Sequence, residues 1–379
     1  MAQNNSENVK IAGGLIDDFL ARTGISDPAG NPRRRYLWTD AFAVQSCFAL
    51  SHVLNRDDYF RYALKLIDQV HLVLGKHRID DERKGWISGL PEEEGLDHPT
   101  IGGLRIGKDL PERTETEPFN QQLEWERDGQ YFHYLTRWFN ALVLAYDETN
   151  DKKYALWAVE LIKAGSSFIV KSNGRIRMAW KMNTDLTEPA VETMGAHDPM
   201  EGLISVIRGM LMVPEKKQML KPFKNDLEML CRNMNWFTND PLGIGGLLIN
   251  AERTAVLKLI GKSLPESIQP DNLFASGLQG LEVFAKDNYS PRQPAKFRLA
   301  FRECGLTTGI HVLYNQKQKY LSLDLELDKL SKFIPLVTEI ENFWIKPENQ
   351  LATTWIDHLD INAVTLASSL LAHEYPRAY

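Results

Sequence analysis

Acidic side chains accompanied by tryptophan, histidine or arginine stand just before four of the most apolar stretches of the chain. Carboxylates bind sugar hydroxyls and transfer protons, and planar aromatic rings pack against the C–H faces of sugars. Glycosidic hydrolysis needs two carboxyl groups, one acting as acid and the other as base or nucleophile. If these segments converge in space, they would form a carbohydrate-binding funnel. The segments are 33–40 (RRRYLWTD), 124–131 (EWERDGQY), 194–201 (MGAHDPME) and 354–360 (TWIDHLD).

The first three segments supply the catalytic groups that we predict, which are Asp40, Asp128, His197 and Asp198. Substrate-binding side chains are predicted in the first, second and last of these segments and in the long loop that precedes the second segment. In this prediction the tryptophans stack on sugar rings, and the two arginines pair with an acidic group of the substrate. These residues are Trp38, Trp86, Arg105, Trp125, Glu126, Arg127, Trp355, His358 and Asp360.

Every one of these residues also has a purely structural explanation. Aspartate is a preferred helix N-cap, so Asp40, Asp198 and Asp360 can each be caps. The tryptophans can be core residues. Arginines gather near these segments in an otherwise acidic chain, which fits either an anionic sugar or a solvated charged surface. The arginines are Arg33, Arg34, Arg35, Arg78, Arg83, Arg105 and Arg113.

Two kinds of helical pattern alternate along the chain and would position these segments. The first kind is apolar on every side, and such a helix must be packed on every side. The second kind, typified by 57–74 and 151–170, has apolar residues at i, i+3, i+4 and i+7 and charges on the opposite face, as surface helices do. The apolar runs are 40–54, 138–146, 202–213 and 361–372.

This alternation predicts an all-α fold of six helical hairpins, an (α/α)6 toroid with an inner and an outer ring. A solenoid of helix pairs is the competing architecture, but it requires a more regular repeat than these spacings show. A short hairpin arm is predicted at 175–182, after the turn residues Asn173 and Gly174. The inner helices are expected at 40–54, 129–147, 198–213, 249–262, 296–314 and 360–374. The outer helices are expected at 9–23, 57–75, 151–170, 216–235, 271–286 and 325–345.

One long segment, 76–122, separates an outer helix from the second inner helix. Loops of this length in compact domains are usually functional or disordered, and this loop has more apolar residues than a disordered linker needs. We therefore expect a single domain, 1–379, in which 76–122 is a lid loop over the funnel. Glycines such as Gly102 and Gly103 would let its backbone approach a ligand.

Composition narrows the possible functions. The chain has 379 residues, 43% hydrophobic content and a formal charge of −6, which argues against a general nucleic-acid binder. The cysteines Cys47, Cys231 and Cys304 lack metal-binding spacing and stand in apolar contexts typical of reduced, buried thiols. No signal peptide or transmembrane run is seen, so we expect a cytoplasmic protein without a metal, cofactor or membrane partner.

The segments RYLWTDAF and EWERDGQYFHYLTRWFNAL resemble the starts of the first two inner helices in the six-hairpin glycosidase superfamily. The resemblance implies an (α/α)6 toroid and an enzyme that acts on a small saccharide or oligosaccharide. The leading hypothesis is a glycoside hydrolase that uses paired carboxylates on a sugar that can be anionic. One alternative is a sugar epimerase or isomerase with His197 and His358 as acid and base. Another is a non-catalytic helical binding or scaffold protein whose acidic residues are caps.

Overall fold

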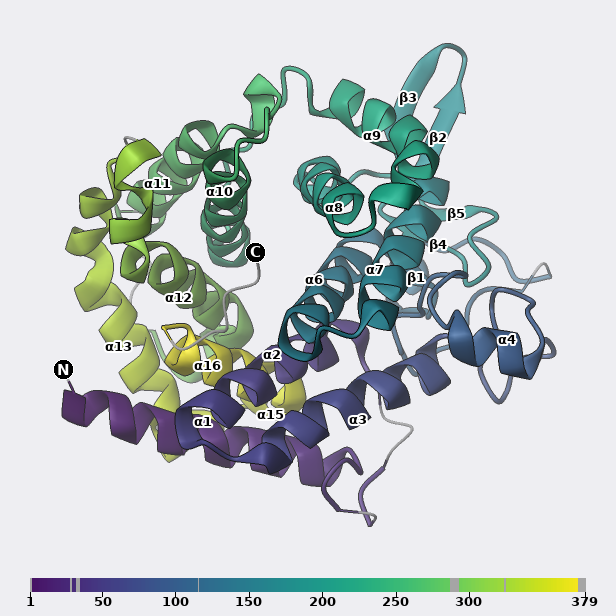
Figure 1. Ribbon diagram of the computed structural model, residues 1–379. Helices are drawn as coiled ribbons and strands as arrows, with labels where there is room; N and C mark the ends of the chain where they lie inside the picture. The colour runs from purple at the N-terminus through teal and green to yellow at the C-terminus, as the bar shows by residue number, and fades with distance from the viewer. Residues whose placement is uncertain are drawn as a thin grey trace.

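The computed structural model describes residues 2–27, 29–31, 35–114, 116–286, 293–323 and 325–373. In this part of the chain, two sets of six long helices form concentric rings (Figure 1). The inner ring contains α2 (Leu37–Leu54), α6 (Phe132–Thr149), α8 (Asp198–Met212), α10 (Pro241–Leu259), α12 (Ala300–Asn315) and α16 (Leu359–Leu371). The outer ring contains α1 (Ala2–Arg22), α3 (Asp57–Leu74), α7 (Lys152–Ala164), α9 (Lys217–Cys231), α11 (Pro270–Lys286) and α13 (Ile334–Ile345). The fold is therefore the predicted (α/α)6 toroid.

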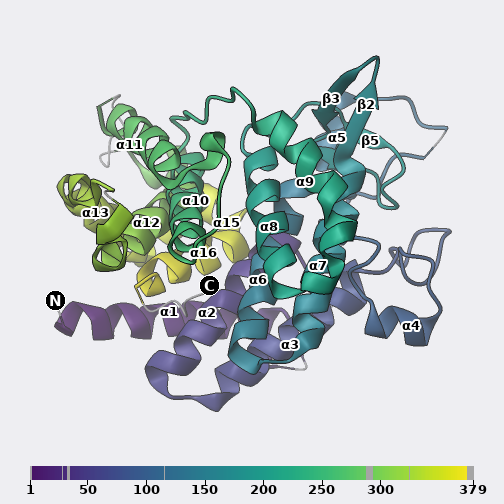
Figure 2. The same cartoon turned by 45° about the horizontal axis from the view of Figure 1, so that its top comes forward.

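The ring closes because the last inner helix, α16, packs against the first, α2, and also against the outer helix α1 (Figure 2). Closure excludes the solenoid, whose end helices would not meet. Each of the other inner helices packs against the outer helix that follows it in the chain. The contact between α8 and α10 is the weakest around the ring.

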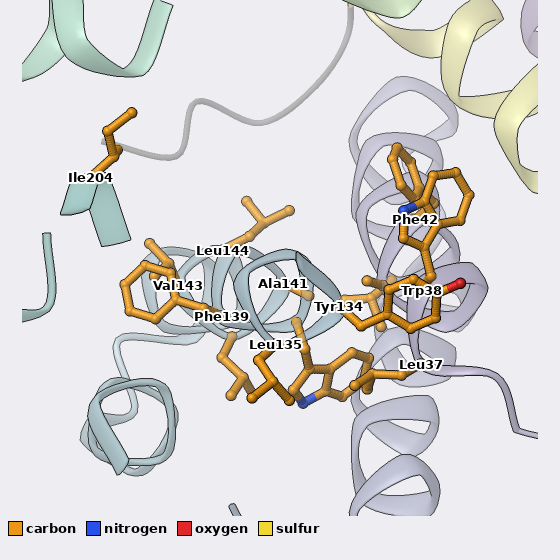
Figure 3. Close-up of a cluster of buried hydrophobic side chains, with 14 of the residues drawn as sticks. Leu37, Trp38, Phe42, Tyr134, Leu135, Phe139, Ala141, Val143, Leu144 and Ile204 are labelled. Carbon is orange, nitrogen blue, oxygen red and sulfur yellow. The ribbon is translucent and has the colours of Figure 1, made fainter. Parts of the chain in front are cut away.

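The inner helices owe their position to their apolar surfaces. In α2, the residues from Leu37 to Leu50 are buried except for Gln45, as expected for a helix with no polar face. The other three apolar runs are likewise buried over most of their length. Asn55 and Asn150 end α2 and α6 in the left-handed conformation, with φ of 51° and 55°, which asparagine tolerates. Figure 3 shows how Leu37, Trp38 and Phe42 of α2 lie beside Tyr134 and Leu135 of α6.

Several helix boundaries differ from the prediction by more than three residues, and two of the differences have a clear physical reason. Helix α10 begins at Pro241, eight residues before the expected start. The added turns contain glycines that allow a neighbouring helix to pack closely. A Cβ on Gly245 would lie 2.1 Å from the carbonyl oxygen of Gly305, so glycine lets α10 and α12 approach closely. The expected outer helix 325–345 is divided into a 3-10 helix (Leu327–Phe333) and α13, with Pro335 in the first turn of α13.

Short elements connect the rings. Strands β2 (Ile169–Ser172) and β3 (Arg175–Met178) form an antiparallel hairpin whose turn is Asn173 and Gly174. The predicted arm at 175–182 therefore ends at Met178, and residues 181–182 pair in a different sheet. A second sheet has the antiparallel order β1 (Gln130–Tyr131), β4 (Lys181–Met182), β5 (Pro189–Val191). The short α-helices are α4 (Glu92–Asp97), α5 (Gln121–Glu126), α14 (Pro347–Gln350) and α15 (Thr353–Ile356). The remaining 3-10 helices are Gly165–Phe168, Pro214–Lys216, Glu266–Ile268, Ala295–Phe297 and Lys317–Leu323.

None of the helices in the described part of the chain combines the length and the apolar composition that crossing a membrane requires.

Candidate active site

A cavity of about 650 Å³ lies where α2 and α16 begin, and we call it the site cavity. Its wall is formed by the first turns of these helices, the segment before each of them, the end of α1, residues 107–110 of the lid loop, and Glu126. A larger depression of about 870 Å³, between α1 and residues 345–350, contains none of the predicted site residues. The residues that line the site cavity are Phe19, Arg35, Tyr36, Thr39, Asp40, Gly107, Lys108, Asp109, Leu110, Glu126, Asp357, His358, Leu359, Asp360 and Ile361.

Three of the four acidic segments therefore meet at this cavity. Asp40 comes from the first segment, Glu126 from the second, and His358 and Asp360 from the last. They are brought together because α2 and α16 are neighbours in the closed ring and because the end of α5 lies over their starts.

Asp40 is the most perturbed of the carboxyl groups in the cavity wall. It is 1% exposed, its Oδ1 lies 3.3 Å from Nη1 of Arg35, and its Oδ2 accepts a hydrogen bond from the backbone N–H of Tyr36 at 3.0 Å. Burial raises the pKa of Asp40 to about 6, and the charge of Asp360 adds to this, while Arg35 opposes it. A carboxyl group with this pKa can carry a proton in mildly acidic solution.

The other acidic groups of the cavity differ from Asp40 in environment. Glu126, Asp109 and Asp357 are exposed. Asp360 is half-buried, and its Oδ1 accepts hydrogen bonds from Nε and Nη2 of Arg22 at 3.2 and 2.9 Å. Burial lowers the pKa of Lys108, whose ammonium group donates to the carbonyl oxygen of Trp125. The cavity thus contains one buried carboxyl group and several solvated ones.

Two tyrosines join the cavity wall to the inside of the ring. The hydroxyl groups of Tyr36, which lines the cavity, and Tyr134, on α6, are 2.7 Å apart. Burial raises the pKa of both phenols, so both remain protonated at neutral pH. Neither tyrosine was predicted as a site residue, although Tyr36 stands within the first acidic segment.

Asp128 lies outside the cavity lining and anchors the lid loop. Its buried carboxylate accepts hydrogen bonds from the guanidinium group of Arg105 and from the backbone N–H groups of Gly107 and Lys108, the latter two at 3.0 and 3.3 Å. Nη1 of Arg78 lies 3.7 Å from the same carboxylate. This arrangement fixes the part of the lid loop that lines the cavity.

His197 and Asp198 also lie outside the lining, so the predicted grouping of all four catalytic candidates in one cavity is not what the structure shows. Nε2 of His197 is 2.9 Å from the carbonyl oxygen of Trp236, and burial lowers the pKa of this histidine. Asp198 is the first residue of α8, and burial raises its pKa well above the ordinary value. His197 and His358, the pair suggested for an epimerase, do not share the site cavity. The catalytic roles of Asp128, His197 and Asp198 remain predictions.

The predicted stacking tryptophans are mostly core residues. Trp38 packs on Phe42 with ring centroids 4.3 Å apart (Figure 3), and Trp355 stacks on Trp344 at 5.7 Å. These two tryptophans and Trp86 are 2 to 4% exposed, which leaves too little ring surface for a sugar. Of the four, Trp125 alone is partly exposed, and it packs against Trp180.

The two predicted substrate-binding arginines are engaged within the protein. Arg105 pairs with Asp128, and Nη2 of Arg127 lies 3.0 Å from Oε1 of Glu117. Arg33 and Arg34 lie outside the described residues. Among the described side chains, no group of three or more histidine, cysteine, aspartate or glutamate residues is arranged to hold a metal ion.

The fold of this chain has relatives among solved structures, although no model of a protein family and no curated protein matches the sequence. The chain is similar to structures of the α-1,6-mannanase GH76A of Salegentibacter sp. HEL1_6. One is an inactive variant with two adjacent aspartates changed to alanine, in complex with α-1,6-mannotetrose, at a TM-score of 0.56 and 12% identity. Another, at a TM-score of 0.53 and 10% identity, is the same mannanase. Each comparison covers 97% of this chain and 98% of the other. At this identity the likeness shows the fold alone, which is the (α/α)6 toroid.

Proposed function

We propose that this protein is a carbohydrate-processing enzyme, and specifically a glycoside hydrolase that binds its substrate in the site cavity. The proposal rests on two carboxyl groups of the cavity wall whose environments differ. Asp40 is a buried carboxyl group with a pKa of about 6, while Glu126 is exposed in the same cavity. Hydrolysis of a glycosidic bond uses two carboxyl groups whose environments separate their roles in this way.

In this proposal Asp40 is the general acid that protonates the leaving oxygen. We assign the role of base or nucleophile to Glu126, an exposed carboxylate of the cavity like Asp109 and Asp357, whereas Asp360 is held by Arg22. Tyr36 lines the same wall and can donate a hydrogen bond to the sugar. Residues 107–110 would act as the lid over the bound saccharide, and their attachment to Asp128 supports this role.

The mannanase structures bear on the substrate. That enzyme has been captured with α-1,6-mannooligosaccharides in inactive variants in which two adjacent aspartates are replaced. The adjacent aspartate pairs of this chain are 17–18, 57–58 and 80–81, and none of them lines the site cavity. We therefore propose that its catalytic carboxyl groups come from separate segments of the chain, and that its substrate is an oligosaccharide of a different composition.

The test is turnover of a panel of oligosaccharides, both neutral and uronate-containing and including α-1,6-mannooligosaccharides, followed by mass spectrometry. We expect Asp40→Asn and Glu126→Gln each to reduce turnover by about 10²-fold or more, the size of a general acid–base contribution. Asp271→Asn, at an exposed carboxyl group in α11 outside the cavity, is the control and should retain most activity.

The pH profile is a second readout of the same proposal. A general acid must be protonated, so turnover by the native enzyme should fall as the pH rises through about 6, the pKa of Asp40. Absence of turnover on the whole panel would contradict the proposal. So would full activity of both Asp40→Asn and Glu126→Gln.

A further inference from the structure

Three consecutive inner helices each carry one arginine. They are Arg137 on α6, Arg208 on α8 and Arg253 on α10. Arg208 is 5% exposed, and the side chain of Arg137 is 13% exposed. A buried guanidinium group normally has a carboxylate partner, because the loss of its hydration must be compensated.

Within the described part of the chain, only one of the three arginines has such a partner. Nη2 of Arg137 lies 2.9 Å from Oε1 of Glu201, at the start of α8. The same carboxylate accepts hydrogen bonds from Oγ1 of Thr136 at 2.8 Å and from Nδ2 of Asn250 at 3.4 Å. Although burial raises the pKa of Glu201, the charge of Arg137 and the bond from Thr136 outweigh it and lower that pKa. Glu201 is therefore an anion already engaged by three donors.

Arg208 and Arg253 are bound by neutral groups instead. Nη1 of Arg208 donates to Oδ1 of Asn140 at 2.7 Å, and Nη1 of Arg253 donates to Oδ1 of Asn250 at 3.2 Å. Nη2 of Arg208 is buried and has no hydrogen-bond partner in the described residues, and the same is true of Nε of Arg137. Among those residues, no carboxylate oxygen lies within 4.0 Å of a nitrogen of Arg208 or Arg253.

More distant charges do not change this result. The carboxylates of Glu252 and Asp147 act on Arg208, but Oε1 of Glu252 accepts the hydroxyl of Tyr320 and Asp147 is exposed. Burial lowers the pKa of Arg253 to about 9, and the positive charges of Arg137 and Arg208 lower it further, while the carboxylates of Glu201 and Glu252 oppose this shift without contacting the guanidinium group. Asn250 links two of the arginines, because it accepts from Arg253 and donates to Glu201, the partner of Arg137.

An anion bonded to these guanidinium groups would compensate the loss of their hydration. We propose that Arg137, Arg208 and Arg253 form a subsite for the anionic group, carboxylate or phosphate, of a sugar. Arginine suits both groups because its planar fork donates two parallel hydrogen bonds to either. The inference rests on the proposed function, since it specifies the substrate class of the same enzyme.

Helix α6 carries both a residue of the subsite and a tyrosine bonded to the wall of the site cavity. Tyr134, whose hydroxyl bonds that of Tyr36 in the cavity wall, stands three residues before Arg137. Three residues advance a helix by about 4.5 Å, so Arg137 lies roughly one turn beyond the tyrosine pair. The anionic group would therefore bind deeper in the ring than the bond that is cleaved.

Direct binding tests the subsite without requiring turnover. Glucuronate, glucose 6-phosphate and uncharged glucose would each be titrated into the native protein by calorimetry, with thermal melts in parallel. We expect one or both anionic sugars to bind and to raise the Tm, with an affinity that falls as salt is added, while glucose does neither. Preference for one of the two anions identifies the natural group as carboxylate or phosphate.

Variants decide whether the arginines are responsible. Arg208→Gln and Arg253→Gln should each weaken binding of the anionic sugar about 10-fold or more, the expected loss of a charge-assisted bond. Arg175→Gln, at an exposed arginine in the β2–β3 hairpin, should leave it unchanged. Without ligand, Arg208→Gln should keep or raise the Tm, because it removes an unpaired buried charge.

Two results would overturn the inference: anionic sugars that bind no better than glucose, or unchanged binding in both Arg208→Gln and Arg253→Gln. Because binding is measured without catalysis, a failed hydrolysis panel with intact anion binding would reject only the proposed reaction.

Discussion

The arginines around the lid loop and those inside the ring have opposite electrostatic situations. Every described arginine of the first group lies within 4.0 Å of a carboxylate, whereas Arg208 and Arg253 have no such partner among the described residues. The number of arginines in a region therefore does not measure its uncompensated positive charge. That charge depends on how many of the arginines pair with carboxylates. We call the first group the rim arginines: Arg35, Arg78, Arg83, Arg105, Arg113 and Arg127.

Sequence neighbourhood explains much of the difference. Arg78 pairs with Asp80 and Arg83 pairs with Asp81, two residues away in each case, so the loop neutralises itself locally. Arg208 stands in the run GLISVIRGMLMV, where no acidic residue occupies a position three or four residues away on the same helix face. Its counter-charge must come from another helix or from a ligand.

The largest expected effect concerns the pairing at the rim. Asp128→Ala would leave Arg105 without its buried partner and free the backbone of the lid loop. We expect a loss of about 3–5 kcal/mol in the free energy of unfolding, measured by urea titration. Asp80→Ala, at an exposed pair, is the control and should cost about 1 kcal/mol or less. A small effect of Asp128→Ala would show that rim pairing contributes little to the fold.

Glu201→Gln tests the arginines inside the ring, because it would remove the ion pair that Glu201 makes with Arg137. We expect a loss of about 1–3 kcal/mol, since Arg137 would become a third unpaired buried cation. The same variant should be stabilised by anionic sugars more than the native protein is. Equal melting temperatures and equal responses to anions would argue against an unbalanced interior charge.

Asp198→Asn tests a buried carboxyl group that lacks an arginine partner among the described residues. Burial raises its pKa, so the folded protein keeps a proton that the unfolded chain releases, and the stability of the native protein falls as pH rises above the ordinary value near 4. Asparagine cannot ionise, so the variant should be as stable as the native protein or more so by about 1 kcal/mol at pH 8. The difference should disappear toward pH 4. A variant that is less stable by the same amount at both pH values would contradict the raised pKa.

The smallest effect is expected at a solvent-exposed pair. Arg177 and Glu192 are 39% and 69% exposed and lie 2.8 Å apart. Arg177→Gln should change the free energy of unfolding by about 0–1 kcal/mol, and high salt should remove even that difference. A larger, salt-resistant loss would mean that exposure is a poor guide to the value of an ion pair in this protein.

The architecture was predictable because its signal is repeated along the whole chain. Apolar runs such as 202–213 and amphipathic runs such as 57–74 identified inner and outer helices by their periodicity alone. The start of α10 was not predictable, because Gly245 has low helix propensity and its value lies in a contact with Gly305, sixty residues away. The sequence around either glycine gives no indication of such a distant contact.

The candidate site was predictable only in part, for a similar reason. Asp40, Glu126 and Asp360 were found because acidic residues before inner helices meet at one end of a closed ring. Asp128 also precedes an inner helix, but its carboxylate is paired with Arg105, and sequence periodicity cannot predict that pairing. The interior arginines do have a signal in the sequence, namely a single charge such as Arg208 within a helix that is apolar on all sides.

Closure of the ring by α16 has a consequence for how the chain acquires its structure. The contact between Ser46 and Ser368 spans 322 positions of sequence, and that between Arg22 and Asp360 spans 338. Contacts between such distant residues form slowly, because a long stretch of chain must first be brought together. During synthesis, the apolar face of α2 that α16 will cover stays open until the residues of α16, more than 300 positions later, have left the ribosome. Assistance from chaperones, and aggregation in their absence, should therefore depend on this early hairpin more than on the helices made later.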